Sequence, residues 1–210
     1  FSQTGTVHGN NIVEISGNIN TNVTWKKDSV YFIKGDIRIY AVLTIEAGTI
    51  IKFNEGTYMV CDDGKILARG TKELPIIFTS IRDDSYGGDT NADEDGTSPA
   101  KGDWDFISIG GTNNASKFDY CKFFYGGGYA EYMDYTLNLE SAATSVTNCT
   151  FAHNIGLNEG ALSAKDAENV TISGNIFYKN EIPLGINGHF DLDNSNMFHN
   201  PEDASETNTH

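Results

Sequence analysis

Short runs of alternating apolar and polar residues cover most of this chain, and glycine, asparagine and aspartate separate one run from the next. Such runs, bounded by turn-forming residues, are typical of β-strands. No stretch keeps the apolar spacing of three and four residues that an amphipathic helix requires, so little helix is expected. The first half of the chain contains six such runs, at residues 13–19, 30–39, 43–53, 58–61, 64–68 and 76–79. The pattern predicts an all-β protein.

The second half of the chain is a structural repeat. The segment Val-Thr-Ile-Ser-Gly-Asn-Ile-Phe-Tyr-Lys-Asn at residues 170–180 has related copies at residues 116–126, 144–154 and 190–200. The third position of each copy is apolar (Phe118, Val146, Ile172, Leu192), as is the eighth (Phe123, Phe151, Phe177, Met197). A repeat of this length, made of short strands, is typical of a β-solenoid in which equivalent residues stack in columns. We therefore expect a parallel β-helix with both apolar columns inside.

The last position of each copy predicts a corner of the coil. It is occupied by Gly126, Asn154, Asn180 and Asn200. Asparagine tolerates the left-handed backbone conformation that a corner needs, and stacked side-chain amides can hydrogen-bond along the axis. This column is expected to form an asparagine ladder.

At 210 residues the chain is long enough for one sizeable core, and we expect a single domain. Residues 1–12 are expected to be a polar lead-in, residues 83–103 an acidic loop inserted between turns, and residues 201–210 a flexible tail. Of the three cysteines, Cys121 and Cys149 share one repeat position and would lie on neighbouring turns. They are interpreted as two small buried thiols, with a disulfide as the alternative.

Several sequence runs resemble those of bacterial secreted right-handed parallel β-helix proteins of the pectate-lyase-like superfold. They are Leu43-Thr-Ile-Glu-Ala-Gly-Thr-Ile-Ile-Lys-Phe, Gly64-Lys-Ile-Leu-Ala-Arg-Gly-Thr, Pro75-Ile-Ile-Phe-Thr-Ser, Gly87-Gly-Asp-Thr-Asn and Gly102-Asp-Trp. The resemblance spans about residues 13–200 and implies a right-handed coil, here of about seven turns. It also implies a secreted or cell-surface location and an acidic loop of the calcium-binding type. Because this superfold carries many activities, the resemblance indicates the fold much more than the function.

The acidic loop is the strongest chemical signal. Asp89, Asn91, Asp93 and Asp95 fall at alternate positions and offer the hard oxygen ligands that Ca²⁺ prefers. The spacing differs from an EF-hand, because the sixth position is Glu94 in place of glycine. We expect a calcium site here, with Asp84 and Asp103 as further ligands; the alternative is a solvated acidic loop without an ion.

Two other sets of residues are candidates for chemistry. Asp191 and Asp193 would face outward two residues apart, within the range of a glycosidase acid–base pair, although ordinary surface aspartates are the favoured interpretation. A glycine-rich loop presents four tyrosines that are able to stack on a sugar: Tyr125, Tyr129, Tyr132 and Tyr135. The alternative is that these rings cover the side of the coil.

The charge balance narrows the choice of partners. A net charge of −15 argues against binding to nucleic acid and to anionic membrane surfaces. No run of 18 apolar residues exists, so no membrane insertion is expected. The leading hypothesis is a non-enzymatic, calcium-stabilised β-solenoid module that acts as a scaffold, adhesin or assembly subunit and self-associates through its open ends. The alternative is a polysaccharide-binding or polysaccharide-degrading β-helix protein.

Overall fold

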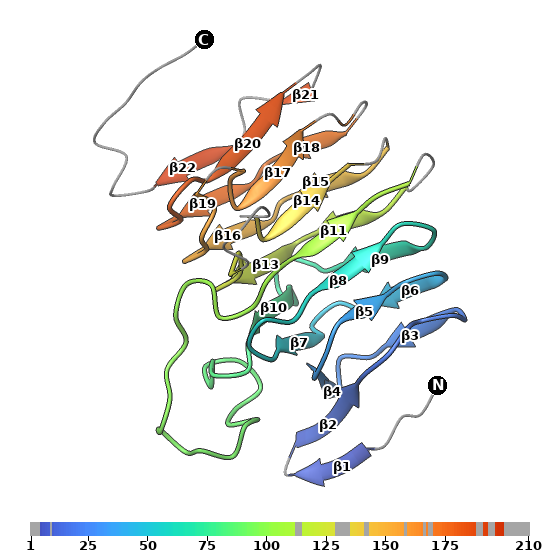
Figure 1. Cartoon of the computed structure of the whole chain (residues 1–210), viewed down its shortest axis with the longest axis vertical. Coiled ribbons are helices and arrows are strands. Elements are labelled where there is room, and N and C mark those ends of the chain that lie inside the picture. The colour runs from blue at the N-terminus through green and yellow to red at the C-terminus, as the bar shows by residue number, and fades with distance from the viewer. Residues whose placement is uncertain are drawn as a thin grey trace.

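The computed structural model describes residues 5–8, 10–111, 115–128, 135–140, 143–157, 159–165, 167, 170–187, 191–192 and 196–199. All regular elements in these ranges are β-strands, which are arranged in three sheets (Figure 1). Among the described residues there is no helix that is long and apolar enough to cross a membrane.

Sheet 1 has nine strands: β1 (Gly5–His8), β2 (Asn10–Ile15), β4 (Ser29–Ile33), β7 (Ile50–Phe53), β10 (Ile76–Ser80), β13 (Cys121–Phe124), β16 (Thr150–Ala152), β19 (Ile176–Tyr178) and β22 (Met197–His199). Sheet 2 has six: β5 (Ile37–Arg38), β8 (Met59–Cys61), β11 (Ile107–Ile109), β14 (Leu137–Leu139), β17 (Leu162–Lys165) and β20 (Leu184–Asn187). Sheet 3 has seven: β3 (Val23–Trp25), β6 (Val42–Ile45), β9 (Lys65–Arg69), β12 (Lys117–Asp119), β15 (Ser145–Thr147), β18 (Thr171–Ser173) and β21 (Asp191–Leu192).

The chain visits the sheets in a fixed cycle. From β4 onward each strand of sheet 1 is followed by one of sheet 2, then one of sheet 3, and every neighbouring pair within a sheet is parallel except β1 and β2. Parallel strands joined by crossovers are right-handed in nearly all proteins. The protein is a right-handed parallel β-helix, as predicted, and the seven strands of sheet 3 mark its turns.

The N-terminal edge differs from expectation. Residues 5–8 and 10–12, expected as lead-in, belong to β1 and β2, and β1 runs antiparallel to β2 across the edge of sheet 1. The sequence of this region is polar, but a strand at the edge of a sheet needs only backbone hydrogen bonds to join it.

The predicted core columns are confirmed over most of the coil. Phe118, Val146, Ile172 and Leu192 are register partners in sheet 3. In sheet 1, Phe123, Phe151 and Phe177 stack with ring centroids 4.7 and 5.2 Å apart. The prediction that Met197 continues this column is wrong, because Phe177 pairs with Phe198, whose ring lies 5.0 Å away. Met197 is instead exposed.

The corners contain two hydrogen-bonded columns. In the first, Oδ1 of Asn154 accepts the backbone N–H of Gly126, and Oδ1 of Asn180 accepts both the backbone N–H and the side-chain amide of Asn154. Asn154 and Asn180 therefore form the predicted ladder, while Asn200 lies outside the described residues. The left-handed conformation belongs to the preceding residues, Tyr125, His153 and Lys179, so the asparagines act only through their amides.

A second column was not predicted as a ladder. Oδ1 of Asn175 accepts the backbone N–H of Cys149, and Oδ1 of Asn196 accepts that of Asn175. Cys121 and Cys149 continue the column as buried free thiols, with the Cys121 N–H directed at Sγ of Cys149. Small polar side chains at this corner therefore satisfy backbone groups that the tight turn leaves unpaired.

Candidate functional site

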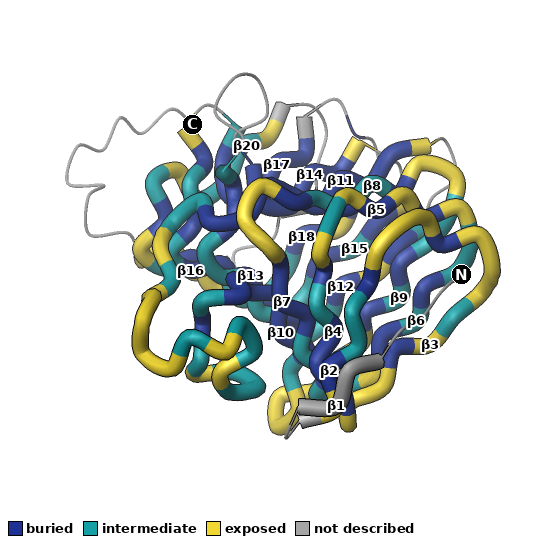
Figure 2. The backbone as a smooth tube through the Cα atoms, turned by 60° about the horizontal axis from the view of Figure 1, so that its bottom comes forward, coloured by how far each residue is buried: buried dark blue, intermediate teal, exposed yellow. Residues whose placement is uncertain are grey.

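The loop between β10 and β11 lies against the outward face of sheet 1, where Figure 2 shows it as a separate lobe beside the coil. The close approach depends on Gly87, whose φ is +73° and at which a Cβ atom would lie 2.8 Å from Cγ2 of Val30. Thr79 donates its hydroxyl to Asp83 at 2.6 Å, and Lys52 donates to the carbonyl oxygen of Gly88 at 2.6 Å. These contacts fix the base of the acidic loop on three neighbouring strands.

Three carboxylates of the loop converge. Asp84, Asp89 and Asp93 each place one oxygen within 4.8 Å of the others. The backbone N–H groups of Asp93 and Glu94 donate to Asp89 at 3.3 and 2.9 Å, and the side-chain amide of Asn91 donates to Oδ2 of Asp93 at 2.8 Å. This arrangement orients the carboxylates around one point, referred to below as the acidic cluster (Asp84, Asp89, Asp93 and Asn91).

The acidic cluster contains acceptors without donors. Three of its oxygens are shielded from solvent and accept no hydrogen bond: Oδ1 of Asp84, Oδ1 of Asn91 and Oδ1 of Asp93. A buried oxygen left unpaired costs about 1–3 kcal/mol, and more when it carries charge. Hard anionic and amide oxygens in a short loop are the donor set that fits Ca²⁺, so the residues present suit this ion.

Lys52 is the counter-charge beneath the acidic cluster. Burial lowers its pKa, while the carboxylates of Asp84, Asp83 and Asp89 oppose that fall. In turn, burial raises the pKa of Asp84, the Lys52 ammonium opposes the rise, and the neighbouring carboxylates Asp89, Asp93 and Asp83 add to it. One ammonium faces four carboxylates, so the loop keeps an excess of negative charge.

Two of the predicted metal ligands lie apart from the cluster. Asp95 is exposed and is not one of the converging carboxylates. Asp103 is buried at the end of the loop, where it accepts hydrogen bonds from Ser80, Arg82 and the backbone of Ala100. Its ion pair with Arg82, at 2.8 Å, gives this carboxylate a structural role in closing the loop.

Two of the four predicted tyrosines belong to the described residues, and they lie beside different sheets. Tyr125 is half-buried beside sheet 1, where its ring packs against Phe124 and His153. Tyr135 is buried and contacts Phe106 on sheet 2, edge to face, with ring centroids 5.3 Å apart. Tyr129 and Tyr132 lie outside the described residues.

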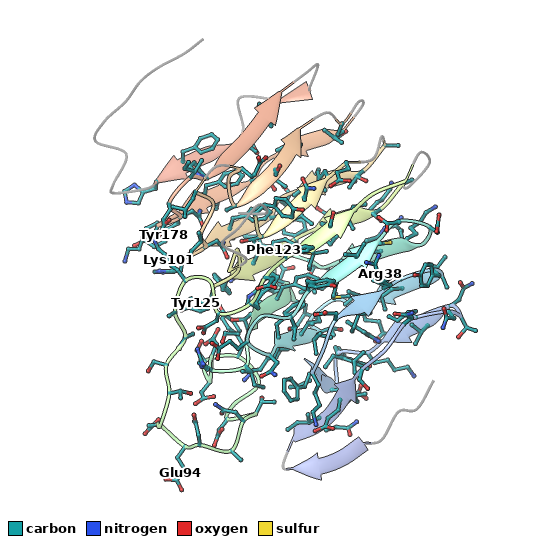
Figure 3. The ribbon with its side chains drawn as sticks, viewed as in Figure 1. Arg38, Glu94, Lys101, Phe123, Tyr125 and Tyr178 are labelled. Carbon is teal, nitrogen blue, oxygen red and sulfur yellow. The ribbon has the colours of Figure 1, made fainter. Side chains whose placement is uncertain are left out.

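A groove on the outward face of sheet 2 was missed by the sequence analysis. Its volume is about 340 Å³, and its floor contains the stacked rings of Tyr58 and Phe106, whose centroids are 4.9 Å apart, together with Tyr135. Arg38 and Asp62 form an ion pair of 3.6 Å along one side. These residues come from separate turns and have no shared spacing in the sequence, so only the folded coil reveals the groove (Figure 3 labels Arg38).

Next to this groove lies a carboxylate with a raised pKa. Burial raises the pKa of Asp105, and the negative charge of Asp36 raises it further. Asp36 also interacts with the phenol of Tyr58 at the edge of the groove. Asp105 is buried and is not one of the residues that line the groove, so this shift reflects its buried surroundings.

Most of the candidate acid–base pair, Asp191 and Asp193, lies outside the described residues. Asp191 pairs with Thr171 in sheet 3 by its backbone, but its side chain and the whole of Asp193 lie outside the described residues.

Comparison with known families agrees with this architecture. The model of the pectate-lyase like beta helix domain matches residues 17–134, which is more than half of the chain. The chain belongs to this family. Searches of curated proteins and of solved structures found no match. The family assignment supports the β-helix fold, which is shared by proteins with different functions.

Proposed function

We propose that this β-helix is a non-enzymatic module whose inserted loop binds a calcium ion and which acts as a scaffold, adhesin or assembly subunit. One observation carries the proposal: three converging carboxylates, together with three shielded oxygens that accept no hydrogen bond. A cation would satisfy these oxygens and offset the repulsion among Asp84, Asp89 and Asp93. Because the loop lies against three strands of sheet 1, a bound ion would stabilise the coil itself.

Two properties support the proposal that the module works outside the cell. Extracellular modules bind calcium with dissociation constants of about 10⁻⁴–10⁻³ M. Extracellular fluid supplies calcium at the concentrations that such a weak site requires. A net charge of −15 keeps such a surface soluble in salt and unsuited to nucleic acid. We therefore propose that the protein works outside the cell, as a secreted or surface protein. We also propose that it self-associates through the ends of the coil.

Calorimetric titration with Ca²⁺ and thermal unfolding with and without a chelator test the metal site. The matched variants are Asp93→Asn, inside the acidic cluster, and Asp95→Asn, which is exposed and outside it. Calcium at one hundred times its dissociation constant should stabilise the native protein and Asp95→Asn by about 2.7 kcal/mol. Asp93→Asn should lose most of that gain. An unchanged melting temperature in the chelator, with no heat of binding, would refute the metal site.

The groove on sheet 2 favours a second candidate function, the binding of a polysaccharide. Tyr58, Phe106 and Tyr135 provide apolar ring surface, while Arg38, Asp62 and Glu140 provide polar groups at its sides. Concave sites of this size with a few convergent polar groups are typical of ligand pockets. Arg38 and Asp62 pair with each other at 3.6 Å, and this candidate function is binding alone, with no catalytic step assigned to the groove.

Affinity electrophoresis on a panel of neutral and acidic polysaccharides tests the groove. Tyr58→Ala should abolish the retardation of the native protein, because it removes one of the two stacked rings. Tyr40→Ala, which changes an exposed tyrosine outside the groove, is the control and should leave the retardation unchanged. Equal migration of all three proteins in every polysaccharide would reject this candidate.

A further inference from the structure

The outward face of sheet 1 is covered along its first half and open along its second half. One outward column runs through Val30, Ile50, Ile77, Lys122, Thr150, Ile176 and Met197. The acidic loop covers the beginning of this column, where Gly87 lies against Val30 and Ile50. At the far end Ile176 is 39% exposed and Met197 59% exposed. The same column thus changes from covered to solvent-exposed along the coil.

A second outward column shows the same change. It runs through Phe32, Lys52, Thr79, Phe124, Ala152, Tyr178 and His199. Under the loop, Lys52 is completely buried and bonded to the Gly88 carbonyl, and Phe124 stacks on Tyr86 of the loop at 5.5 Å. Beyond the loop, the rings of Tyr178 and His199 stack on each other at 5.4 Å and remain accessible.

The open part is bordered by cations. Lys122 belongs to the first column, and Nζ of Lys179 lies 5.0 Å from the ring centroid of Tyr178. Lys101, in the last part of the inserted loop, is labelled with Tyr178 in Figure 3. Burial lowers the pKa of His153, and the positive charges of Lys179 and Lys101 lower it further. The strands β13, β16, β19 and β22 contain no aspartate or glutamate. In a chain with a net charge of −15, this surface is a local exception.

We propose that the open half of sheet 1 (Lys122, Ile176, Tyr178, Lys179 and Met197) binds an acidic peptide segment of a partner protein. The chain itself shows the kind of occupant that fits these columns: the loop that covers their first half is a turn-rich, glycine-containing acidic segment with one tyrosine, at residues 83–97. Aliphatic and aromatic side chains flanked by lysines match such a segment in both apolar surface and charge.

Fluorescence anisotropy with a labelled synthetic peptide of the sequence of residues 83–97 tests this proposal. The full chain should bind it, and a peptide with every aspartate and glutamate changed to the amide should bind at least about tenfold more weakly. The double variant Lys122→Gln, Lys179→Gln should weaken binding of the acidic peptide about tenfold, since it removes two positive charges that would pair with acidic side chains. The double variant Lys72→Gln, Lys117→Gln makes the same charge change at exposed positions elsewhere, and its affinity should stay within about twofold of the native value.

Four results of the binding assay would overturn the proposal. They are an absence of binding by the native protein, equal binding of the acidic and amide peptides, equal weakening by the two double variants, and binding of an acidic oligosaccharide with no binding of the peptide. Sedimentation velocity without peptide provides an independent check. Self-association that the Lys122→Gln, Lys179→Gln variant abolishes would assign the face to a second copy of the chain and also overturn the proposal. Unchanged thermal unfolding of both double variants would confirm that each is folded.

Discussion

The ammonium nitrogen of Lys52 lies 2.6 Å from the carbonyl oxygen of Gly88, which joins β7 to the inserted loop 36 residues further along the chain. Lys52 is completely buried, and burying an ammonium group is costly unless it is paired. Its hydrogen bond and the surrounding carboxylates provide that pairing. Lys52 therefore holds the loop on the coil through groups of the chain itself.

Replacing Lys52 by methionine should lower the free energy of unfolding by about 1–3 kcal/mol in the presence of a chelator, because the Gly88 carbonyl loses its donor and the carboxylates lose their counter-charge. Chemical denaturation measures this. Lys117→Met, at an exposed position on sheet 3, should change stability by less than about 0.5 kcal/mol. If both variants unfold alike, Lys52 does not anchor the loop.

Asn180→Ala should destabilise the coil by about 1–3 kcal/mol. The change removes the acceptor for two donors of Asn154 and the donor to the carbonyl oxygen of Phe151, all of them buried. Urea denaturation provides the measurement, with the exposed Asn20→Ala as the control. A loss no larger than that of the control would mean that the ladder adds nothing to stability.

The three cysteines should resist a thiol reagent in the native protein and react fully in denaturant. All three are buried thiols outside any disulfide, and burial raises the pKa of Cys121 well above its usual value, so little reactive thiolate forms there. Reaction with Ellman's reagent, followed at 412 nm, measures both states. Rapid release of one or more thiol equivalents from the native protein would contradict the buried column.

Tyr135 should ionise late in the folded protein, since burial raises its pKa to about 12. In the unfolded chain it ionises near pH 10. The folded protein therefore holds the proton more tightly, and this contribution to stability is present below pH 10 and lost as the pH rises towards 12. Absorbance at 295 nm should show a late transition that Tyr135→Phe removes; the same titration in both proteins would contradict the assignment.

The fold was predictable where the repeat keeps its length. Phe151 and Phe177 are separated by 26 residues, and so are their neighbours Val146 and Ile172, so one alignment places both columns correctly. The last turn is different: Leu192 keeps the predicted register, but one extra residue before β22 places Phe198 against Phe177. A one-residue change in a corner moves every later side chain to the opposite face, and single-sequence comparison does not detect it.

The candidate sites were predictable only in part. Alternate spacing identified Asp89 and Asp93, because the converging residues are close in sequence. The same pattern included Asp95, which is exposed and is not one of the converging carboxylates. The further predicted ligand Asp103 pairs with Arg82, which becomes its neighbour only when the loop closes. The groove on sheet 2 combines residues from distant turns, and no local pattern links them.

The hairpin formed by β1 and β2 makes the first edge of sheet 1 different from its last edge. Every other neighbouring pair in the sheets is parallel, so each turn offers the next a matching set of donors and acceptors. Because β1 already pairs antiparallel with that edge of β2, a further parallel turn cannot pair with β2 directly. Lengthening of this protein by duplication of turns, whether in evolution or in the laboratory, should therefore succeed within the series from β4 to β22 and fail before β2.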